Sequence, residues 1–300
     1  MKIVVLGAAA GGAFPQWNSN AEGCRRARAG DPVAMARSQA GLAVSADGER
    51  WFLMNASPDL RAQIERTPEL HPKAGLRSSP IAGVVLTGGD VDAVAGLLTL
   101  RERQPFSLHA TAATHAVLDA NPIFEVLARD VVARHVQALD RPFALDDRLT
   151  VELFAVPGKI PLYLEQPGQA PLIRTDATTV GAMITDGTTR VFFIPGCAAV
   201  TPELARRLQG ADLVLFDGTL WRDDEMILAG LGQKTGLRMG HISVSGDQGT
   251  LAAFRSIDVE RKILIHINNS NPILLADSPQ RAAVEAAGWT VAHDGLEISL

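Results

Sequence analysis

This chain of 300 residues contains little cysteine, few aromatic side chains and only a small excess of charge. Its two cysteines, Cys24 and Cys197, exclude a scaffold stapled by several disulfides and predict a cytoplasmic location. A formal net charge of −5 and a single tyrosine argue against nucleic acid as a partner, because such binders favour basic patches and stacking aromatics. No apolar run is as long as a membrane span, so no transmembrane segment is expected.

Hydrophobic residues are plentiful, at 47% of the chain, which suffices for a sizeable layered core. The sequence repeats one order in its two halves, in which hairpin strands come first and strand–loop–helix units follow. Two packed sheets need helices over their outer faces to bury those faces. The pattern therefore predicts an α/β protein with four layers, αββα, built from two mixed sheets flanked by helices.

The stretch 81–100 is the centre of this prediction. Its apolar run, residues 81–86, is short and β-branched enough to be a buried strand. Thr87 and two glycines then break the strand, and an apolar helical periodicity follows them. Asp90 and Asp92 therefore lie on a tight loop between a buried strand and a packed helix. Such a loop holds side chains rigidly while leaving them open to a cavity.

The spacing of these two aspartates leaves two interpretations open. Asp90 suits the N-cap of the helix and Asp92 its first turn, where the helix dipole favours negative charge. Two carboxylates two residues apart on a glycine-flanked loop also suit a hard or borderline cation. Residues elsewhere in the chain must decide between capping and metal binding.

Other polar side chains of the second half also follow predicted strands. Cys197 after a Pro-Gly turn and His266 in an apolar strand are each, taken alone, explained better by burial in a core than by a functional role. Asp217 can bond its own turn, whereas His241 lies in a polar loop where packing does not explain it. Since the carboxyl ends of strands line one crevice in layered α/β proteins, their shared placement predicts a site.

Local signals predict several further elements. Residues 18–37 are polar and irregular, a helix begins with Ser57 as its N-cap, and residues 112–136 are rich in helix. Proline and glycine predict a loop over 163–178. A further helix is expected over 245–254.

At these residues the chain resembles the metallo-β-lactamase superfamily. The His-x-His-x-Asp-His loop of that superfamily falls on residues 88–93, and Met239–His241 and Leu264–His266 resemble two of its late histidines. Cys197 falls roughly where the superfamily has a bridging aspartate. A closer resemblance, over almost the full length, is to the B proteins of pyrroloquinoline quinone (PQQ) biosynthesis. The strings that carry it are Gly11–Asn18, Asn55–Asp59, Leu98–Glu102, Val156–Lys159, Ile194–Cys197, Phe216–Thr219, Met239–His241 and His266–Pro272.

The resemblance implies a single metallo-β-lactamase-like domain over residues 1–300. It implies either a protein that carries PQQ or its precursor, or an iron-dependent hydroxylase that uses O₂ on the tyrosine of a Glu–Tyr precursor. In the hydroxylase interpretation the metal ligands would be Asp90, Asp92 and His266, and the catalytic residues would be Asp92 and His241. His241 would transfer protons or bind substrate carboxylates. Fe(II) is the expected cofactor, with another divalent metal or no metal left open.

The chain departs from the family pattern in two loops. The resemblance implies a histidine ligand at position 93, where this chain has Ala93, which cannot bind a metal. It also implies a Cys-x-Cys-x-x-Cys zinc clip after Asn18, of which Cys24 alone is left. No structural zinc is therefore expected at Cys24.

Ala93 keeps functions of different classes open. The metal-dependent oxygenase is favoured, and a non-catalytic carrier of PQQ or its precursor is the alternative. A crevice without a metal would still hold an acidic ligand, and Lys159, Arg174 and Arg238 lie in loops from which they would pair with carboxylates. A hydrolase with a rearranged metal site is a third option.

Overall fold

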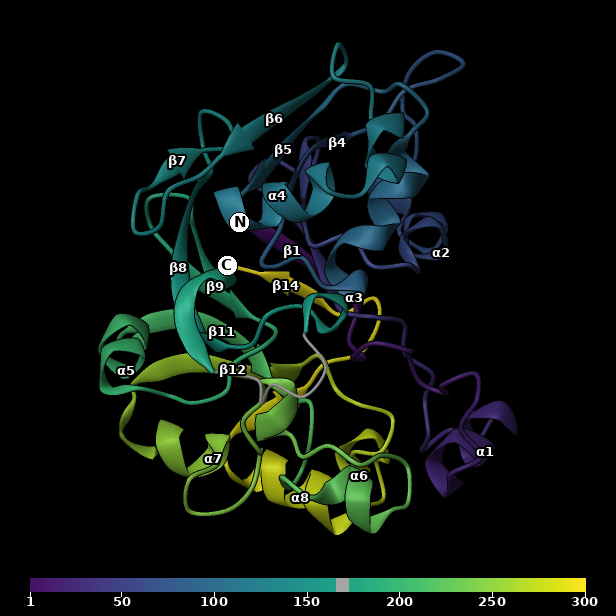
Figure 1. Cartoon of the computed structure of the whole chain (residues 1–300), viewed down its shortest axis with the longest axis vertical. Helices are drawn as coiled ribbons and strands as arrows, with labels where there is room; N and C mark the ends of the chain where they lie inside the picture. The colour runs from purple at the N-terminus through teal and green to yellow at the C-terminus, as the bar shows by residue number, and fades with distance from the viewer. Residues whose placement is uncertain (166–172) are drawn as a thin grey trace.

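The computed structural model describes residues 1–165 and 173–300, which form two β-sheets packed face to face (Figure 1). In the first sheet the neighbouring strands are β14 (Glu297–Ser299), β1 (Lys2–Gly7), β2 (Gly41–Ser45), β3 (Trp51–Met54), β4 (Ile81–Val85), β5 (Phe106–Ala110) and β6 (Val132–Val136). Pairs from β14 to β3 are antiparallel, and pairs from β3 to β6 are parallel. This sheet is therefore mixed, as predicted.

The second sheet repeats that plan. Its neighbouring strands are β13 (Trp289–Val291), β12 (Val259–Ile265), β11 (Ala211–Asp217), β10 (Arg190–Ile194), β9 (Arg174–Thr185), β8 (Thr150–Gly158) and β7 (Phe143–Ala144). The pairs from β7 to β10 are antiparallel, and those from β10 to β13 are parallel. In both sheets the parallel strands place their carboxyl ends on one edge, where a site can form.

Alternation along the strands supplies three hydrophobic cores. Successive side chains of a strand point to opposite faces of the sheet. In β1, Ile3 and Val5 lie between the two sheets, whereas Val4 and Leu6 belong to the core beneath the helices of the first sheet. Strand β10 divides its side chains in the same way between the inter-sheet core and the core under the helices of the second sheet.

Helices cover the outer faces of both sheets, which confirms the four-layer αββα sandwich (Figure 1). The α-helices are α1 (Glu22–Arg28), α2 (Leu60–Arg66), α3 (Val91–Val94), α4 (Ala112–Asp119), α5 (Pro202–Leu208), α6 (Glu225–Leu228), α7 (Thr250–Ala253) and α8 (Pro279–Ala286). Shorter 3-10 turns occupy Pro68–Leu70, Ala95–Leu100, Pro122–Val126, Leu162–Leu164, Leu237–Met239, Phe254–Ser256 and Pro272–Leu274. Leu60 and Leu118 bury α2 and α4 against the first sheet, and Leu204 and Val284 bury α5 and α8 against the second.

Two predictions of irregular or helical structure in the first half are wrong in part, because a helix lies within 18–37 and a strand follows the helical turns of 112–126. The irregular segment 18–37 contains helix α1, whose buried face consists of little more than Cys24 and is too short to produce a visible periodicity. The helix-rich segment 112–136 ends in strand β6, which extends the sheet beside β5. Most of β6 is exposed, so its sequence lacks the apolar alternation of a half-buried strand.

Three further boundaries differ from prediction. Helix α2 has Asp59 at its N-cap, because the Ser57 hydroxyl bonds Gln63 Oε1 at 3.2 Å instead. Helix α7 begins at Thr250 rather than at residue 245. The loop predicted over 163–178 is wrong for 174–178, which pair with β8 as part of β9, while residues 166–172 lie outside the described residues.

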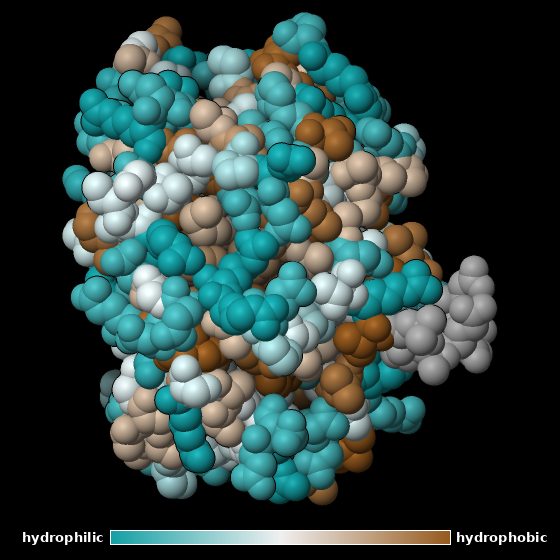
Figure 2. Space-filling view, turned by 90° about the vertical axis from the view of Figure 1, so that its left-hand side faces the viewer, coloured by the Kyte–Doolittle hydropathy of each residue, from teal (hydrophilic) through white to brown (hydrophobic). Residues whose placement is uncertain are grey.

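The two chain ends meet beside the first sheet, where the Met1 amino group donates to the Leu300 carbonyl at 2.7 Å. On the face drawn in Figure 2, hydrophobic residues are scattered among hydrophilic ones. Scattered apolar side chains are normal for a protein surface. None of the helices in the described ranges combines the length and the apolarity needed to cross a membrane.

Candidate functional site

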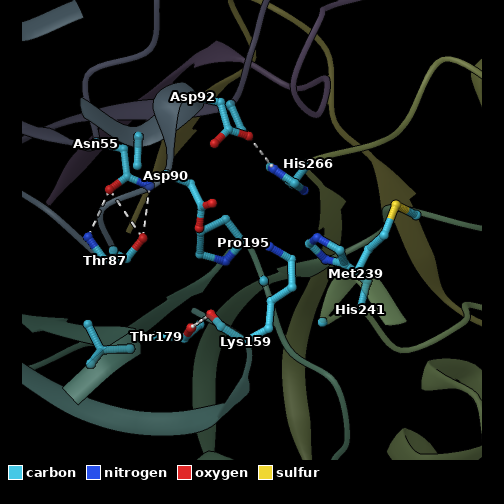
Figure 3. A pocket seen from close by; sticks show the side chains of 16 residues that line it. Asn55, Thr87, Asp90, Asp92, Lys159, Thr179, Pro195, Met239, His241 and His266 are labelled. Carbon is cyan, nitrogen blue, oxygen red and sulfur yellow. Dashed lines mark hydrogen bonds and ion pairs between the residues drawn. The ribbon is translucent and has the colours of Figure 1, made fainter. Parts of the chain in front are cut away.

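A cavity of about 150 Å³ opens where strands of both sheets end (Figure 3). Its walls come from residues that follow β3, β4, β8, β10 and β12, together with the loop before α7. The lining residues are Ala40, Asn55, Thr87, Gly88, Asp90, Asp92, Ala93, Lys159, Thr179, Val180, Pro195, Gly196, Met239, Gly240, His241 and His266. The structure thus brings Asp90, Asp92, His241 and His266 into one pocket.

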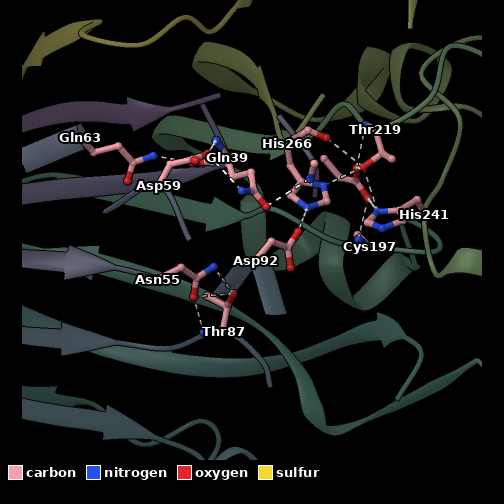
Figure 4. Close-up of polar contacts among 12 residues, drawn as sticks. Gln39, Asn55, Asp59, Gln63, Thr87, Asp92, Cys197, Thr219, His241 and His266 are labelled. Carbon is pink, nitrogen blue, oxygen red and sulfur yellow. Dashed lines mark hydrogen bonds and ion pairs between the residues drawn. The ribbon is translucent and has the colours of Figure 1, made fainter. Parts of the chain in front are cut away.

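A buried pair of side chains fixes the loop after β4. Asn55 donates from Nδ2 to Thr87 Oγ1 at 2.9 Å, and the Thr87 backbone N–H donates back to Asn55 Oδ1 at 2.9 Å (Figure 4). The Thr87 carbonyl then accepts from Val180 N at 2.9 Å, which ties the loop to the second sheet. Sequence analysis did not single out either residue for a role in the site, although Asn55 opens one of the family-like strings.

Asp90 stands at the N-cap position of α3, yet its side chain makes no capping hydrogen bond. Its carboxylate lines the cavity instead. Burial raises the pKa of Asp90, and the negative charge of Asp92 raises it further. Nearby, the Tyr163 hydroxyl donates to the Gly89 carbonyl, and burial with the charge of Asp90 raises the pKa of Tyr163 to about 12. The capping interpretation therefore explains the place of Asp90 in the chain but not its side chain.

Asp92 and His266 connect, across the cavity, the loops that follow β4 and β12 in the two sheets. His266 Nε2 donates to Asp92 Oδ2 at 2.9 Å (Figures 3 and 4). Although burial opposes ionisation of both groups, this hydrogen bond and the attraction between the charges lower the pKa of Asp92 and raise that of His266. Without a metal, the two groups therefore stabilise each other as an ion pair.

A hydrogen-bond network behind the cavity orients both histidines (Figure 4). Asp217 Oδ2 accepts from His241 Nδ1 at 2.7 Å and from the Cys197 backbone N–H at 2.8 Å. The Thr219 hydroxyl lies 2.6 Å from Asp217 Oδ1 and 2.9 Å from His266 Nδ1. Because a carboxylate only accepts, His241 carries its proton on Nδ1, and its Nε2 is left for chemistry in the cavity.

Asp217, His241 and His266 also place one potential ligand atom each within 4.8 Å of one another. The Thr219 hydroxyl lies among these atoms, 3.0 Å from His241 Nδ1, and both Asp217 oxygens already accept hydrogen bonds. A hydrogen bond donated by the far ring N–H of a histidine to a carboxylate is the arrangement that orients a metal-ligating imidazole. We therefore assign this group to positioning the histidines rather than to holding an ion.

The cavity itself offers donors that suit a divalent metal. Asp90 and Asp92 present carboxylate oxygens, and His266 presents an imidazole nitrogen, which is the ligand chemistry of Fe(II) and Zn²⁺ sites. The mutual repulsion that raises the pKa of Asp90 would be relieved by a cation. Ala93 also lines the cavity and adds no donor. The residues present therefore fit a metal, with one side-chain ligand fewer than the family pattern implies.

The two cysteines lie apart from this chemistry. Cys197 is fully buried, donates from Sγ to the Ala199 carbonyl at 3.1 Å, and is not part of the cavity lining. Burial raises the pKa of its thiol well above the usual range, so the thiol stays protonated. Cys24 is buried too, with its Sγ 3.6 Å from Asn269 Oδ1.

Known proteins resemble this chain over its whole length. The family described as Beta-lactamase superfamily domain matches residues 50–267. Coenzyme PQQ synthesis protein B of Gluconacetobacter diazotrophicus is 62% identical over 303 residues, with 99% of each chain covered. The chain belongs to the coenzyme PQQ synthesis protein B family. Its place is therefore in PQQ synthesis, within the metallo-β-lactamase superfamily.

Solved structures agree with this membership. The crystal structure of Zn²⁺-bound PqqB from Methylobacterium extorquens matches with a TM-score of 0.98 at 53% identity, covering 100% of both chains. A diphosphatase of the PhnP family matches with a TM-score of 0.70 at 18% identity, covering 99% of this chain and 96% of its own. The second likeness concerns the fold alone.

Proposed function

We propose that this chain is a metal-dependent oxygenase of PQQ synthesis that hydroxylates the tyrosine ring of a Glu–Tyr precursor. The observation that carries the proposal is the cavity in which Asp90 converges with the Asp92–His266 pair, so that two carboxylates and an imidazole face one space. The Zn²⁺ bound by the Methylobacterium extorquens relative supports a divalent metal in this family. Asp90, Asp92 and His266 would hold Fe(II) here. When bound, ferrous iron supplies the activation of O₂.

The chain's own residues account for binding and proton transfer. Hydroxylation places one oxygen atom of O₂ on a ring carbon, reduces the other to water and takes two electrons from an external reductant. His241 Nε2 is free to accept the proton of a substrate hydroxyl, because Asp217 holds the ring through Nδ1. To hold a metal, His266 would present Nε2 as the ligand atom in place of the hydrogen bond that Nε2 donates to Asp92.

The deciding experiment loads the protein with ferrous iron under argon and measures iron content and oxygen uptake with Glu–Tyr and a reductant. We expect iron in proportion to protein and oxygen uptake that depends on the dipeptide. Asp92→Asn should lose both, whereas Asp147→Asn, a change at an exposed position in the turn before β8, should keep both. Iron-free protein with no oxygen uptake would contradict the oxygenase.

Ala93 favours a second candidate, a carrier of PQQ or its precursor. Position 93 lines the cavity but contributes only a methyl group, so a metal would have fewer ligands than the family pattern implies. Lys159 lines the same cavity and offers a cation to an acidic ligand. Binding of PQQ by metal-free protein, measured by equilibrium titration with no oxygen uptake, would favour the carrier over the oxygenase.

A further inference from the structure

Three cationic side chains gather on a single carboxylate beside the cavity. Arg238 donates from Nη2 to Glu165 Oε2 at 3.0 Å and from Nη1 to Oε1 at 3.3 Å. Lys159 Nζ lies 3.8 Å from Glu165 Oε1, and Lys234 Nζ lies 3.7 Å from Glu165 Oε2. The hydrogen bond from Arg238, with the charges of both lysines, lowers the pKa of Glu165. Glu165 is therefore the anion that this group of cations holds.

The group carries more positive charge than Glu165 can balance. Three cations face this one carboxylate, and positive charge remains in surplus even when Asp90, which acts on Lys159 through its charge, is counted. Lys234 and Arg238 are 39% and 31% exposed. Surplus charge at a partly desolvated position attracts anions more strongly than charge in open water. These cations are thus suited to carboxylates that arrive from solution.

Lys159 connects this group to the cavity. Its side chain lines the cavity and is only 13% exposed (Figure 3). Gly240, with φ of 88°, packs against it so closely that a Cβ would meet Lys159 Cγ at 3.0 Å. The positive charge of Lys159 also opposes the rise in the pKa of Asp90 that burial and Asp92 cause. The cavity therefore has an acidic part at Asp90 and a basic part at Lys159.

We propose that Lys159, Lys234 and Arg238 form a carboxylate-binding site next to the cavity, and that Glu165 occupies this site until a ligand carboxylate replaces it. The ligand is a small aromatic molecule with two or more carboxylates. This inference rests on the proposed function in that it assigns the orientation of the same substrate. The aromatic ring lies toward Asp92 and His266, and the carboxylates lie toward Lys159.

The polarity of the cavity is the reason for that orientation. A carboxylate placed beside Asp90 would meet two negative side chains, whereas one placed beside Lys159 would exchange one ion pair for another. The exchange has a low cost, because Arg238 offers the same two N–H groups to any carboxylate that takes the place of Glu165. The displaced Glu165 carboxylate is then solvated by water.

The first experiment compares PQQ, which has three carboxylates, with its trimethyl ester, which has none, by equilibrium titration of the full chain. We expect the acid to bind more tightly than the ester. Arg238→Gln and Lys234→Gln should each weaken binding of the acid by about 10-fold or more and leave the ester unchanged. Lys73→Gln is the control, because Lys73 is 42% exposed and pairs with Glu49 at 2.9 Å. If Arg238→Gln does not fold, the affinities of Lys234→Gln for the acid and the ester test the proposal by themselves.

The second experiment removes a negative charge from the site, whereas the first removes positive charges. Glu165→Gln removes the internal carboxylate, so PQQ should bind several-fold more tightly to this variant than to the unchanged chain. Equal affinity for acid and ester, or weaker binding of PQQ by Glu165→Gln, would overturn the proposal. Charge-dependent PQQ binding without oxygen uptake would reject the oxygenase and keep this site. Oxygen uptake with a KM unchanged in Lys234→Gln and Arg238→Gln would keep the oxygenase and reject this site.

Discussion

The two sides of the cavity differ in how their polar side chains are held in place. The carboxylate wall consists of Asp90, Asp92 and Ala93, which follow β4, and its acidic groups are held by the backbone of a short loop. The histidine wall consists of His241 and His266 with Asp217 and Thr219 behind them, and nearly every polar atom there has a partner. Within the part of the chain that the structure describes, the Asp92–His266 hydrogen bond is the one that joins the two walls.

This difference shows where the site can change at little cost to the fold. On the carboxylate wall, Asp90 makes no capping hydrogen bond and Ala93 contributes only a methyl group, so a change at either position alters the ligand set at little cost to the fold, whereas Asp92 is paired with His266. A side chain of the histidine wall is part of a buried network, where loss of one partner leaves other polar groups unsatisfied. The family-like ligand is missing at Ala93, on the wall where the fold depends least on it.

The largest effect should come from breaking the histidine wall at Asp217. Asp217→Ala removes the acceptor for the Cys197 and Thr219 backbone N–H groups and for His241, all buried or nearly so. We expect the free energy of unfolding to fall by about 3 kcal/mol or more. Urea denaturation measures this loss. Asp212→Ala on the same strand is the control, since its carboxylate accepts from Arg190 at the exposed strand end. A loss no larger than that of the control would show that the network is dispensable.

The second effect should come from completing the carboxylate wall. Ala93→His places an imidazole on a residue that lines the cavity, next to Asp92 and across from His266. Loss of even an outer partner changes metal affinity or activity by roughly 10–100-fold, so a restored ligand should raise Fe(II) affinity by at least about 10-fold. Anaerobic titration with ferrous iron measures it. Val91→His on the exposed side of α3 is the control. Equal, weak binding by all three proteins would favour the carrier.

The third effect is the contribution of the Asp92–His266 hydrogen bond to stability, which depends on pH. The pKa of His266 is raised, so its contribution to stability is complete below about pH 6.5 and is lost as pH rises through its folded-state pKa. The pKa of Asp92 is lowered, so its contribution is complete above about pH 4 and is lost as pH falls through its folded-state pKa. His266→Asn should therefore cost the metal-free protein about 1 kcal/mol between about pH 4 and pH 6.5.

Asparagine is the replacement of choice for His266, because residue 266 has φ of 59°, a conformation that asparagine tolerates. Denaturation curves of both proteins from acid to neutral pH test the window. A difference in stability that stays constant across the whole range would place the effect in packing rather than in the ion pair.

The smallest effect should come from Asp90, and it has the opposite sign. A carboxyl whose pKa is raised by folding costs stability above its unfolded pKa, about 3.9. Asp90→Asn should therefore stabilise the metal-free protein at pH 7 by about 1 kcal/mol or less, and the gain should vanish below about pH 4. The same variant should bind Fe(II) more weakly. Destabilisation at pH 7 would mean that Asp90 has a cationic partner stronger than its repulsion by Asp92.

The fold was largely predictable because its strands alternate strongly or are fully apolar. Runs such as 81–86 identify a buried strand without any knowledge of its neighbours. Helix α1 and strand β6 escaped prediction because each buries too few side chains to impose a period. The site residues after the strands were likewise visible as polar side chains at strand ends, which is a matter of local sequence.

Which of these residues contact one another could not be predicted from the sequence. Nothing local indicates that Thr219 bonds His266, 47 residues away, or that Glu165 lies among Lys159, Lys234 and Arg238. Such contacts depend on how two sheets bring their edges together. Sequence alone therefore placed Asp217 among the strand-end candidates, with the bond to its own turn as the alternative, but did not reveal that it holds His241, and it gave Glu165 no role.

The sequence by itself determined the layers, because alternation along each strand decides which face is buried regardless of what covers it. It also determined that one loop offers two carboxylates and no histidine at position 93. Only the tertiary structure decided that Asp92 meets His266 and that Asp90 turns from the helix end into the cavity. The physical reason is that charge and hydrogen bonding act through space between segments that are remote in the chain, whereas hydrophobic periodicity acts along the chain itself.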